Sequence, residues 1–158
     1  MRKIPSGNRL QTFQQKRTSM TTTRKADAVW NGNLMEGSGS VSLKSSGVGT
    51  FNVSWPARSQ EPNGQTSPEE LLGAAHAACF SMALSNGLAK AGTPPTQLRT
   101  SAEVDFLPGT GITEIRLRVS GDVPNLDTDG FRAAAEIAKV NCPVSQALKA
   151  VPIKLVVE

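Results

Sequence analysis

The 158-residue sequence predicts one α+β domain in which β-sheets surround a long, buried central helix. Two observations lead to this fold class. Residues 25–55 and 98–119 contain stretches in which polar and apolar side chains alternate, as is typical of half-buried strands. Between them, residues 71–89 contain no Asp, Glu, Lys or Arg, as expected of a helix that is packed on all sides.

Three short strands are expected first, at residues 26–31, 38–43 and 50–55. In the third of them, alternation places Phe51, Val53 and Trp55 on one face of a sheet. Clusters of Gly and Asn between the strands indicate turns. The following polar segment, residues 56–66, is expected to be a loop that leads into the central helix.

The start of the central helix carries several agreeing signals. Ser67 can cap the helix, Pro68 suits its first position, and Glu70 can complete a capping box. We expect the helix to end near Ala91, because Gly92 and two prolines follow it. A membrane-spanning helix would have about this length. Interspersed Gly, His, Ser and Asn residues nevertheless favour a buried helix of a soluble protein, without a membrane partner.

The remaining elements are expected after this helix. They are a hairpin over 98–106 and 112–119, a second helix over 130–140, a third helix from residue 142 and a strand over 151–157. Pro108 and Gly109 form the turn of the hairpin. Thr128 or Asp129 is expected to cap the second helix. Pro143 suits the first position of the third, which makes Cys142 its expected cap residue.

Most of the positive charge lies in the first 19 residues, which contain five basic side chains and no acid. Residues 20–158 hold 12 basic and 13 acidic side chains, so the domain has no basic excess for nucleic acid. Low aromatic content also argues against a stacking platform. We interpret residues 1–19 as a disordered extension or an upstream start before Met20, with a mitochondrial-type presequence as the alternative. We expect a single domain over 20–158 and a cytoplasmic location.

Two cysteines and one histidine are too few for a zinc site, so neither a metal nor a cofactor is expected. In a reducing compartment, paired cysteines are more often catalytic or redox-active than structural. Cys142 would lie at a helix N-terminus, where the N–H groups and the helix dipole lower the pKa of a thiol. The alternative is that Cys142, and equally Cys79, is a small hydrophobic residue of the core.

A reactive Cys79 would need a cation nearby, because an ordinary cysteine is only a few per cent thiolate at pH 7. Arg58, in the loop before the helix, is the candidate. Glu69 and Glu70 are candidates to orient its guanidinium through paired hydrogen bonds. Each of the three could instead be a solvated charge or could serve only the helix start.

Two motifs occur in the order that a known family shows. The segment 67–84 contains Pro-Glu-Glu-Leu and Ala-Ala-His-Ala-Ala-Cys-Phe-Ser-Met-Ala, and the segment 141–148 is Asn-Cys-Pro-Val-Ser-Gln-Ala-Leu. Together they resemble the osmotically inducible protein C (OsmC) and organic hydroperoxide resistance (Ohr) family, and the resemblance covers residues 20–158. It implies the OsmC/Ohr fold, with antiparallel sheets wrapped around the central helix in an intertwined homodimer. His76 suits the OsmC branch, and we interpret it as a packing or supporting residue.

The resemblance also implies an activity. Members are thiol peroxidases that reduce organic hydroperoxides, and a dithiol reductant, a lipoyl group, restores them. Cys79 matches the position that attacks the peroxide, Cys142 the position that resolves it, and Glu69 the active-site glutamate. The Ohr branch takes its arginine from the loop between the first two strands, but residues 31–38 contain none. The OsmC branch supplies it just before the helix, where Arg58 is the only arginine.

The spacing of Glu69 and Cys79 raises a geometric problem, since ten residues of helix span about 15 Å. Either the helix bends early, or Arg58 and Glu69 serve the Cys79 of a second subunit; the intertwined dimer favours the second. Two other functions stay open: a redox-sensing or small-ligand-binding protein of the same fold without efficient turnover, and a protein in which both cysteines only pack.

Overall fold

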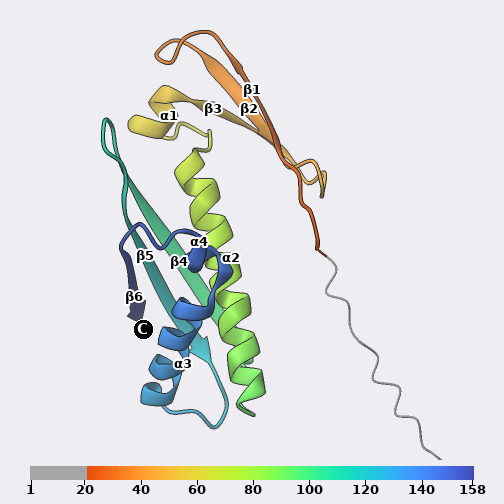
Figure 1. Cartoon of the computed structure of the whole chain (residues 1–158), viewed down its shortest axis with the longest axis vertical. Helices are drawn as coiled ribbons and strands as arrows, with labels where there is room; N and C mark the ends of the chain where they lie inside the picture. Colours follow the sequence, from red (N-terminus) through yellow and green to blue (C-terminus); the bar gives the residue numbers. More distant parts are fainter. Residues whose placement is uncertain (1–20) are drawn as a thin grey trace, which may run out of the picture.

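The computed structural model describes residues 21–158, so the extension expected at residues 1–19 lies outside the described part. Figure 1 shows the elements in chain order. The first half holds β1 (Asp27–Asn31), β2 (Ser38–Ser42), β3 (Thr50–Ser54), α1 (Trp55–Ser59) and α2 (Pro68–Lys90). The second half holds β4 (Gln97–Leu107), β5 (Gly111–Asp122), α3 (Thr128–Asn141), α4 (Pro143–Ala147) and β6 (Ile153–Val157).

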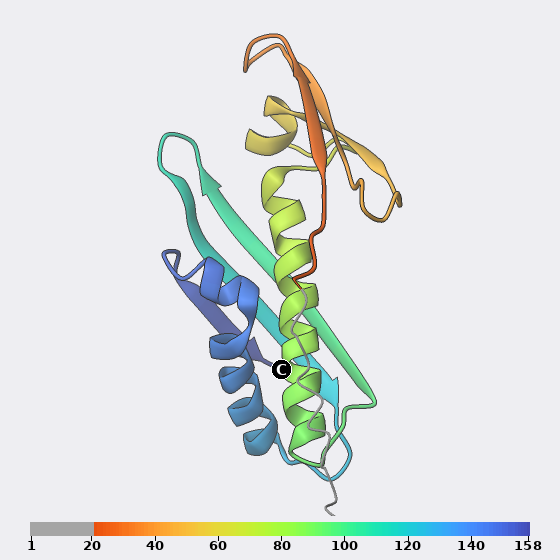
Figure 2. The same ribbon diagram turned by 45° about the vertical axis from the view of Figure 1, so that its right-hand side comes forward.

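The first sheet is an antiparallel meander of β1, β2 and β3. It lies beyond the N-terminal end of α2, away from the second sheet (Figures 1 and 2). Every residue of β1 is exposed, and the exposed side chains of this sheet include Val29, Trp30 and Phe51. Within one chain, this sheet therefore has little hydrophobic core of its own.

The second sheet contains β4, β5 and β6 in that order. β4 and β5 form a long antiparallel hairpin, and Gly109 in its turn has a φ of 83°, which suits glycine. β6 pairs with β5 in parallel, so the second sheet is mixed, and the expectation that both sheets are antiparallel was wrong for this pair of strands. The parallel pairing follows from the connection, because α3 and α4 carry the chain back before β6 begins.

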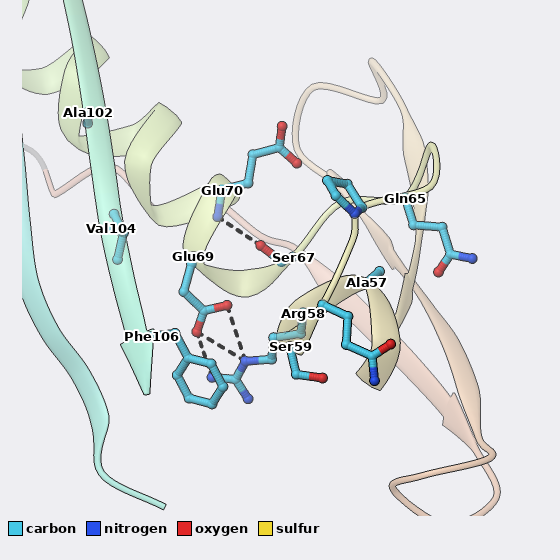
Figure 3. Close-up of a pocket in the computed structure, with 12 residues that line it drawn as sticks. Ala57, Arg58, Ser59, Gln65, Ser67, Glu69, Glu70, Ala102, Val104 and Phe106 are labelled. Atoms are coloured by element: carbon cyan, nitrogen blue, oxygen red, sulfur yellow. Dashed lines mark hydrogen bonds and ion pairs between the residues drawn. The ribbon is translucent and has the colours of Figure 1, made fainter. Parts of the chain in front are cut away.

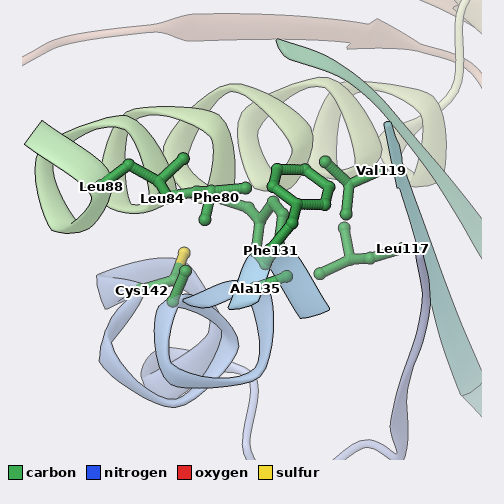
Figure 4. Packing of buried hydrophobic residues seen from close by; sticks show 9 residues of the cluster. Phe80, Leu84, Leu88, Leu117, Val119, Phe131, Ala135 and Cys142 are labelled. Atoms are coloured by element: carbon green, nitrogen blue, oxygen red, sulfur yellow. The ribbon is translucent and has the colours of Figure 1, made fainter. Parts of the chain in front are cut away.

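The hydrophobic core lies between α2, the second sheet and α3 (Figure 4). Its large, fully buried members come from α2 and β5: Phe80, Leu84, Leu88, Leu117 and Val119. Cys142 belongs to the same cluster and is completely buried. The core therefore joins the central helix directly to the segment that carries the second cysteine.

The central helix begins as the sequence predicts, because Ser67 caps it by accepting a hydrogen bond from the Glu70 N–H at 3.1 Å. The capping box is only half formed, since the Glu70 carboxylate instead accepts a hydrogen bond from Thr66. The buried residues of α2 form one stripe: Glu69, Gly73, His76, Phe80, Leu84 and Leu88. Within residues 21–158 of one chain, α2 is therefore buried on one face only, and its opposite face is exposed or half-buried. α2 is long and apolar enough to cross a membrane by length and composition, but a core helix meets the same criterion.

Two expectations about the helices were wrong. Residue 55 begins a short helix, α1, instead of ending a strand, because Ser54 caps it through the Ala57 N–H and Pro56 occupies its first turn. In α3 the capping side chain is Asp127, which accepts a hydrogen bond from the Gly130 N–H at 2.8 Å, and not residue 128 or 129. A carboxylate three residues before a free N–H has the reach that a cap requires.

Candidate functional site

Arg58 and Glu69 form a close ion pair at the N-terminal end of α2. Arg58 Nε donates to both carboxylate oxygens of Glu69, at 3.0 and 3.1 Å, and Nη2 donates to Oε1 at 2.7 Å. The Glu69 side chain is only 8% exposed, whereas that of Arg58 is 32% exposed. Glu70 is exposed and does not bind Arg58, so of the two candidate glutamates only Glu69 orients the guanidinium.

Two aromatic residues hold this ion pair in place. The Arg58 guanidinium carbon lies 4.0 Å from the centre of the Phe106 ring, and Trp55 meets the same ring edge-on with centroids 6.1 Å apart. A cation over an aromatic face is attracted by the ring quadrupole, which adds to the hydrogen bonds. Arg58 and Glu69 line a cavity of about 510 Å³ between α1, the start of α2 and β4 (Figure 3). Sequence reasoning missed Phe106, because nothing local to residue 106 indicates that a cation from α1 reaches it.

Cys79 and Cys142 form the second part of the candidate site. Both are free thiols; Cys79 is partly exposed on α2, and Cys142 is buried as the N-cap residue of α4. Cys79 packs against the core cluster that contains Cys142, and the two thiols influence each other's ionisation. The structure therefore brings together the two cysteines that the sequence could only suggest as a pair.

The two thiols differ in how easily they ionise. Burial raises the pKa of Cys79, and contact with Cys142 raises it further, against a hydrogen bond from the Val144 N–H. Burial also opposes ionisation of Cys142, but the N–H and hydroxyl of Ser145, together with Cys79 and the Val144 N–H, lower its pKa below the ordinary value. The Cys142 sulfur makes no N-cap hydrogen bond of regular geometry, so these groups act as nearby dipoles. Within one chain, negative charge on the pair therefore favours Cys142.

Arg58 and Glu69 do not reach Cys79 of the same chain. α2 is one continuous helix from Pro68 to Lys90, so the Glu69 and Cys79 positions are separated by about 15 Å along its axis. Arg58 is not among the groups that shift the pKa of Cys79. The four candidate residues thus fall into two pairs, one at the start of α2 and one in its middle.

His76 lies one turn before Cys79 on α2 and is fully buried. Its Nε2 is 2.8 Å from the Ser145 hydroxyl, whereas Nδ1 is buried without a hydrogen-bond partner. Burial lowers the pKa of His76, so the ring is neutral at pH 7. Sequence reasoning placed His76 as a packing or supporting residue but gave no role to Ser145, although it stands in the quoted Cys-Pro-Val-Ser motif. Among residues 21–158, no group of three or more His, Cys, Asp or Glu side chains could hold a metal ion.

Solved structures of the same fold define the class of protein. The chain superposes on an organic hydroperoxide resistance protein OsmC from Legionella pneumophila with a TM-score of 0.68, 23% identity, and coverage of 87% of this chain and 99% of that chain. An organic hydroperoxide resistance protein from Elizabethkingia anophelis gives a TM-score of 0.65 at 25% identity, with coverage of 88% and 99%. The OsmC/Ohr fold predicted from the sequence is confirmed.

Sequence relatives identify the family more closely. The family model described as OsmC-like protein matches residues 61–156. Peroxiredoxin OsmC of Escherichia coli (strain K12) is 43% identical over 134 residues, which cover 83% of this chain and 93% of that protein. Peroxiredoxin OsmC of Shigella flexneri matches to the same extent. The chain belongs to the OsmC family, and the OsmC branch that the position of Arg58 suggested is confirmed.

Proposed function

We propose that this protein is a thiol-dependent peroxidase that reduces organic hydroperoxides to alcohols. The Cys79 thiolate attacks the peroxide, the O–O bond breaks, the alkoxide takes a proton to leave as an alcohol, and Cys79 becomes a sulfenic acid. Cys142 then displaces the hydroxyl group as water and forms a disulfide with Cys79. A dithiol, a lipoyl group, reduces this disulfide by exchange and restores both thiols. The relatives named as peroxiredoxins and organic hydroperoxide resistance proteins support this assignment.

One observation carries the proposal: a partly exposed cysteine is packed against a buried cysteine at a helix N-terminus. Solvent exposure lets a peroxide reach Cys79 but not Cys142. The buried partner adjoins Cys79, since each thiol shifts the pKa of the other, and in the proposed cycle it condenses with the oxidised sulfur. If both cysteines only packed in the core, we would expect neither the difference in their exposure nor the position of Cys142 at a helix N-terminus.

We infer that Arg58 and Glu69 act on the Cys79 of a second copy of the chain. A cation within about 4–6 Å lowers the pKa of a thiol, and no cationic side chain among residues 21–158 of the same chain acts on Cys79 in this way. The exposed face of α2 and the exposed apolar side chains of the first sheet provide surface for a homodimer. In the proposed dimer, the Arg58–Glu69 pair of one subunit would lie beside the cysteine pair of the other, although the two pairs are far apart within each subunit.

Stopped-flow oxidation of the reduced protein tests the function. With cumene hydroperoxide we expect rapid loss of both thiols, slower loss with hydrogen peroxide, and turnover with dihydrolipoamide. Cys142→Ser should stop at a sulfenic acid on Cys79 that dimedone traps, and Cys79→Ser should not react. Oxidation no faster than that of free cysteine would contradict the peroxidase function and favour a protein of the same fold without efficient turnover.

A mixed dimer tests whether the site is shared. A Cys79→Ser chain carries an intact Glu69, and a Glu69→Ala chain carries an intact Cys79. Differently tagged copies are co-expressed, and the heterodimer is purified on both tags. A shared site predicts that the heterodimer regains one working site while both parent homodimers stay inactive. A heterodimer as inactive as its parents would show that Glu69 acts within its own chain.

A further inference from the structure

His76 and Ser145 form a buried polar pair that the proposed peroxidase cycle does not use. In the part of the chain that the structure describes, the buried polar or charged residues are Glu69, His76 and Ser145. Glu69 is paired with Arg58, which leaves the imidazole and the hydroxyl as a separate pair between α2 and α4. Burying polar groups is unfavourable unless they are hydrogen-bonded, so we asked what role this buried pair could have.

The position of Ser145 relative to Cys142 indicates such a role. Cys142 is the N-cap of α4, and Ser145 stands three residues later, at the third helical position. These two positions adjoin each other across the first turn of a helix, where a capping box links them through their backbone N–H groups. The hydroxyl that meets His76 also lies near the sulfur of Cys142, since the N–H and the hydroxyl of Ser145 both help lower the pKa of that thiol.

The orphaned ring nitrogen fixes where the protons lie. A neutral imidazole carries one N–H, and Nδ1 is buried with no partner, whereas Nε2 faces the Ser145 oxygen at 2.8 Å. Buried N–H groups without an acceptor are rarer than buried lone pairs without a donor, so the N–H belongs on Nε2. His76 then donates to Ser145, and the hydroxyl hydrogen of Ser145 is free to point at Cys142.

Few other groups can influence this thiol. Among the described residues, the ionisable side chain that shifts the pKa of Cys142 is Cys79, from α2. Cys142 belongs to a cluster of apolar side chains from α2, α3 and β5, and Leu88, Phe131 and Leu117 are among them. Among the buried side chains that the structure describes, Glu69 is the charged one, and it lies at the far end of the α2 stripe, in its pair with Arg58.

We propose that His76 and Ser145 are positioning residues for the resolving cysteine: His76 Nε2–H orients the Ser145 hydroxyl, which donates its hydrogen to Cys142 Sγ and stabilises the thiolate. The role in turnover rests on the proposed function. In the resolving step the Cys142 thiolate attacks the sulfur of the Cys79 sulfenic acid, an S–S bond forms and the S–O bond breaks. The departing hydroxide takes up a proton from solvent, equivalent to the one that Cys142 released, and leaves as water. His76 and Ser145 keep their own protons throughout.

The first test does not depend on peroxidase activity. In full-length Cys79→Ala protein, Cys142 is the only cysteine, and its ionisation is followed by thiolate absorbance at 240 nm against pH. We expect Ser145→Ala to raise the midpoint by about one pH unit, a roughly tenfold loss of thiolate at neutral pH, since it removes a hydrogen-bond donor to the charged sulfur. Ser145→Thr keeps the hydroxyl and should restore the midpoint. His76→Leu should raise it as well, and His76→Gln, which keeps a donor, should raise it less.

Ser81→Ala is the matched control. Ser81 is a partly buried serine of α2 whose hydroxyl bonds to Ala77 and Thr100, away from Cys142. Its loss should leave the midpoint unchanged. If Ser145→Ala titrates at the same pH as Ser81→Ala, the proposal is wrong. Should Ser145→Ala fail to fold, judged by near-UV circular dichroism, His76→Leu and Ser145→Thr decide: equal midpoints in these two variants overturn it.

A second measurement separates this inference from the proposed function. With Cys79 present and one equivalent of cumene hydroperoxide, the rate of disulfide formation is followed from pH 5 to 9. The Ser145→Ala profile should shift to higher pH in parallel with the titration, while the rate of the first oxidation stays the same. No disulfide in any variant would contradict the proposed function alone, whereas disulfide formation with an unshifted profile would contradict the role of Ser145 alone.

Discussion

Removing either partner of the Arg58–Glu69 pair should destabilise the protein by very different amounts. Arg58→Ala leaves a carboxylate whose side chain is 8% exposed without the three hydrogen bonds that it accepts from Arg58 Nε and Nη2. Breaking a buried ion pair from one side costs about 3–5 kcal/mol. Because the adjoining cavity lets some water reach Glu69, we expect about 2–3 kcal/mol of lost stability.

The reverse substitution should cost much less. After Glu69→Ala, the guanidinium is already a third exposed to solvent, and it keeps its contact with the Phe106 ring at 4.0 Å. We therefore expect a loss of about 1 kcal/mol or less from this change. The double substitution removes the stranded charge together with its partner, so its cost should fall below the sum of the single changes by about 1–2 kcal/mol.

Urea unfolding of the reduced proteins at one protein concentration measures these differences. Lys139→Ala is the control, because Lys139 forms a surface ion pair with Glu136 and should change stability by less than about 0.5 kcal/mol. Equal losses for Arg58→Ala and Glu69→Ala, or strict additivity in the double variant, would refute the view that a buried carboxylate dominates this pair.

Three further predictions concern other parts of the molecule. Burial lowers the pKa of His76, the only histidine, so the stability that its neutral ring contributes is complete above about pH 6.5 and is lost as the pH falls. Urea unfolding should therefore show up to about 1.4 kcal/mol less stability at pH 5.5 than at pH 7.5, and His76→Gln should lack this difference. Phe80→Ala should cost about 3–5 kcal/mol in the same assay, since Phe80 is fully buried, and a loss below 1 kcal/mol would contradict its place in the core. Met82 is 66% exposed on α2, on the face that the proposed homodimer would bury. Met82→Arg should therefore leave far-UV circular dichroism unchanged but halve the molecular mass measured by light scattering, whereas an unchanged dimer mass would exclude this face from the interface.

The sequence predicted those features that depend on neighbours along the chain. The start of α2 is marked by Ser67 and Pro68, and the start of α4 by Pro143, so both helix starts could be located to the residue. The hairpin of β4 and β5 followed from alternation and a Pro-Gly turn. The short helix α1 carried the same kind of signal in Ser54 and Pro56, but the alternation that ends at Trp55 concealed it.

Features that depend on distant residues could not be predicted in this way. Phe106 stacks on Arg58 because β4 passes the end of α1, and nothing in the sequence around either residue specifies that contact. The bond between His76 and Ser145 joins residues on two helices far apart in the chain. The one-sided burial of α2 was also hidden, because a charge-free helix has the same composition whether its second face is covered by its own chain or by another.

Because the Arg58–Glu69 pair and the cysteine pair are separate in one chain, dimerisation through the exposed face of α2 would affect the chemistry of the thiols. In one chain the charge of the thiol pair favours Cys142, which a peroxide cannot reach, while the accessible Cys79 has a raised pKa. In such a chain Cys142 is ready for the proposed resolving step, but Cys79 is not ready to attack a peroxide. In the proposed dimer, the partner's Arg58 would lower the pKa of Cys79 and draw the charge to the accessible sulfur. Assembly would then do more than bury apolar surface, because it would decide which of the two sulfurs carries the negative charge before a peroxide arrives.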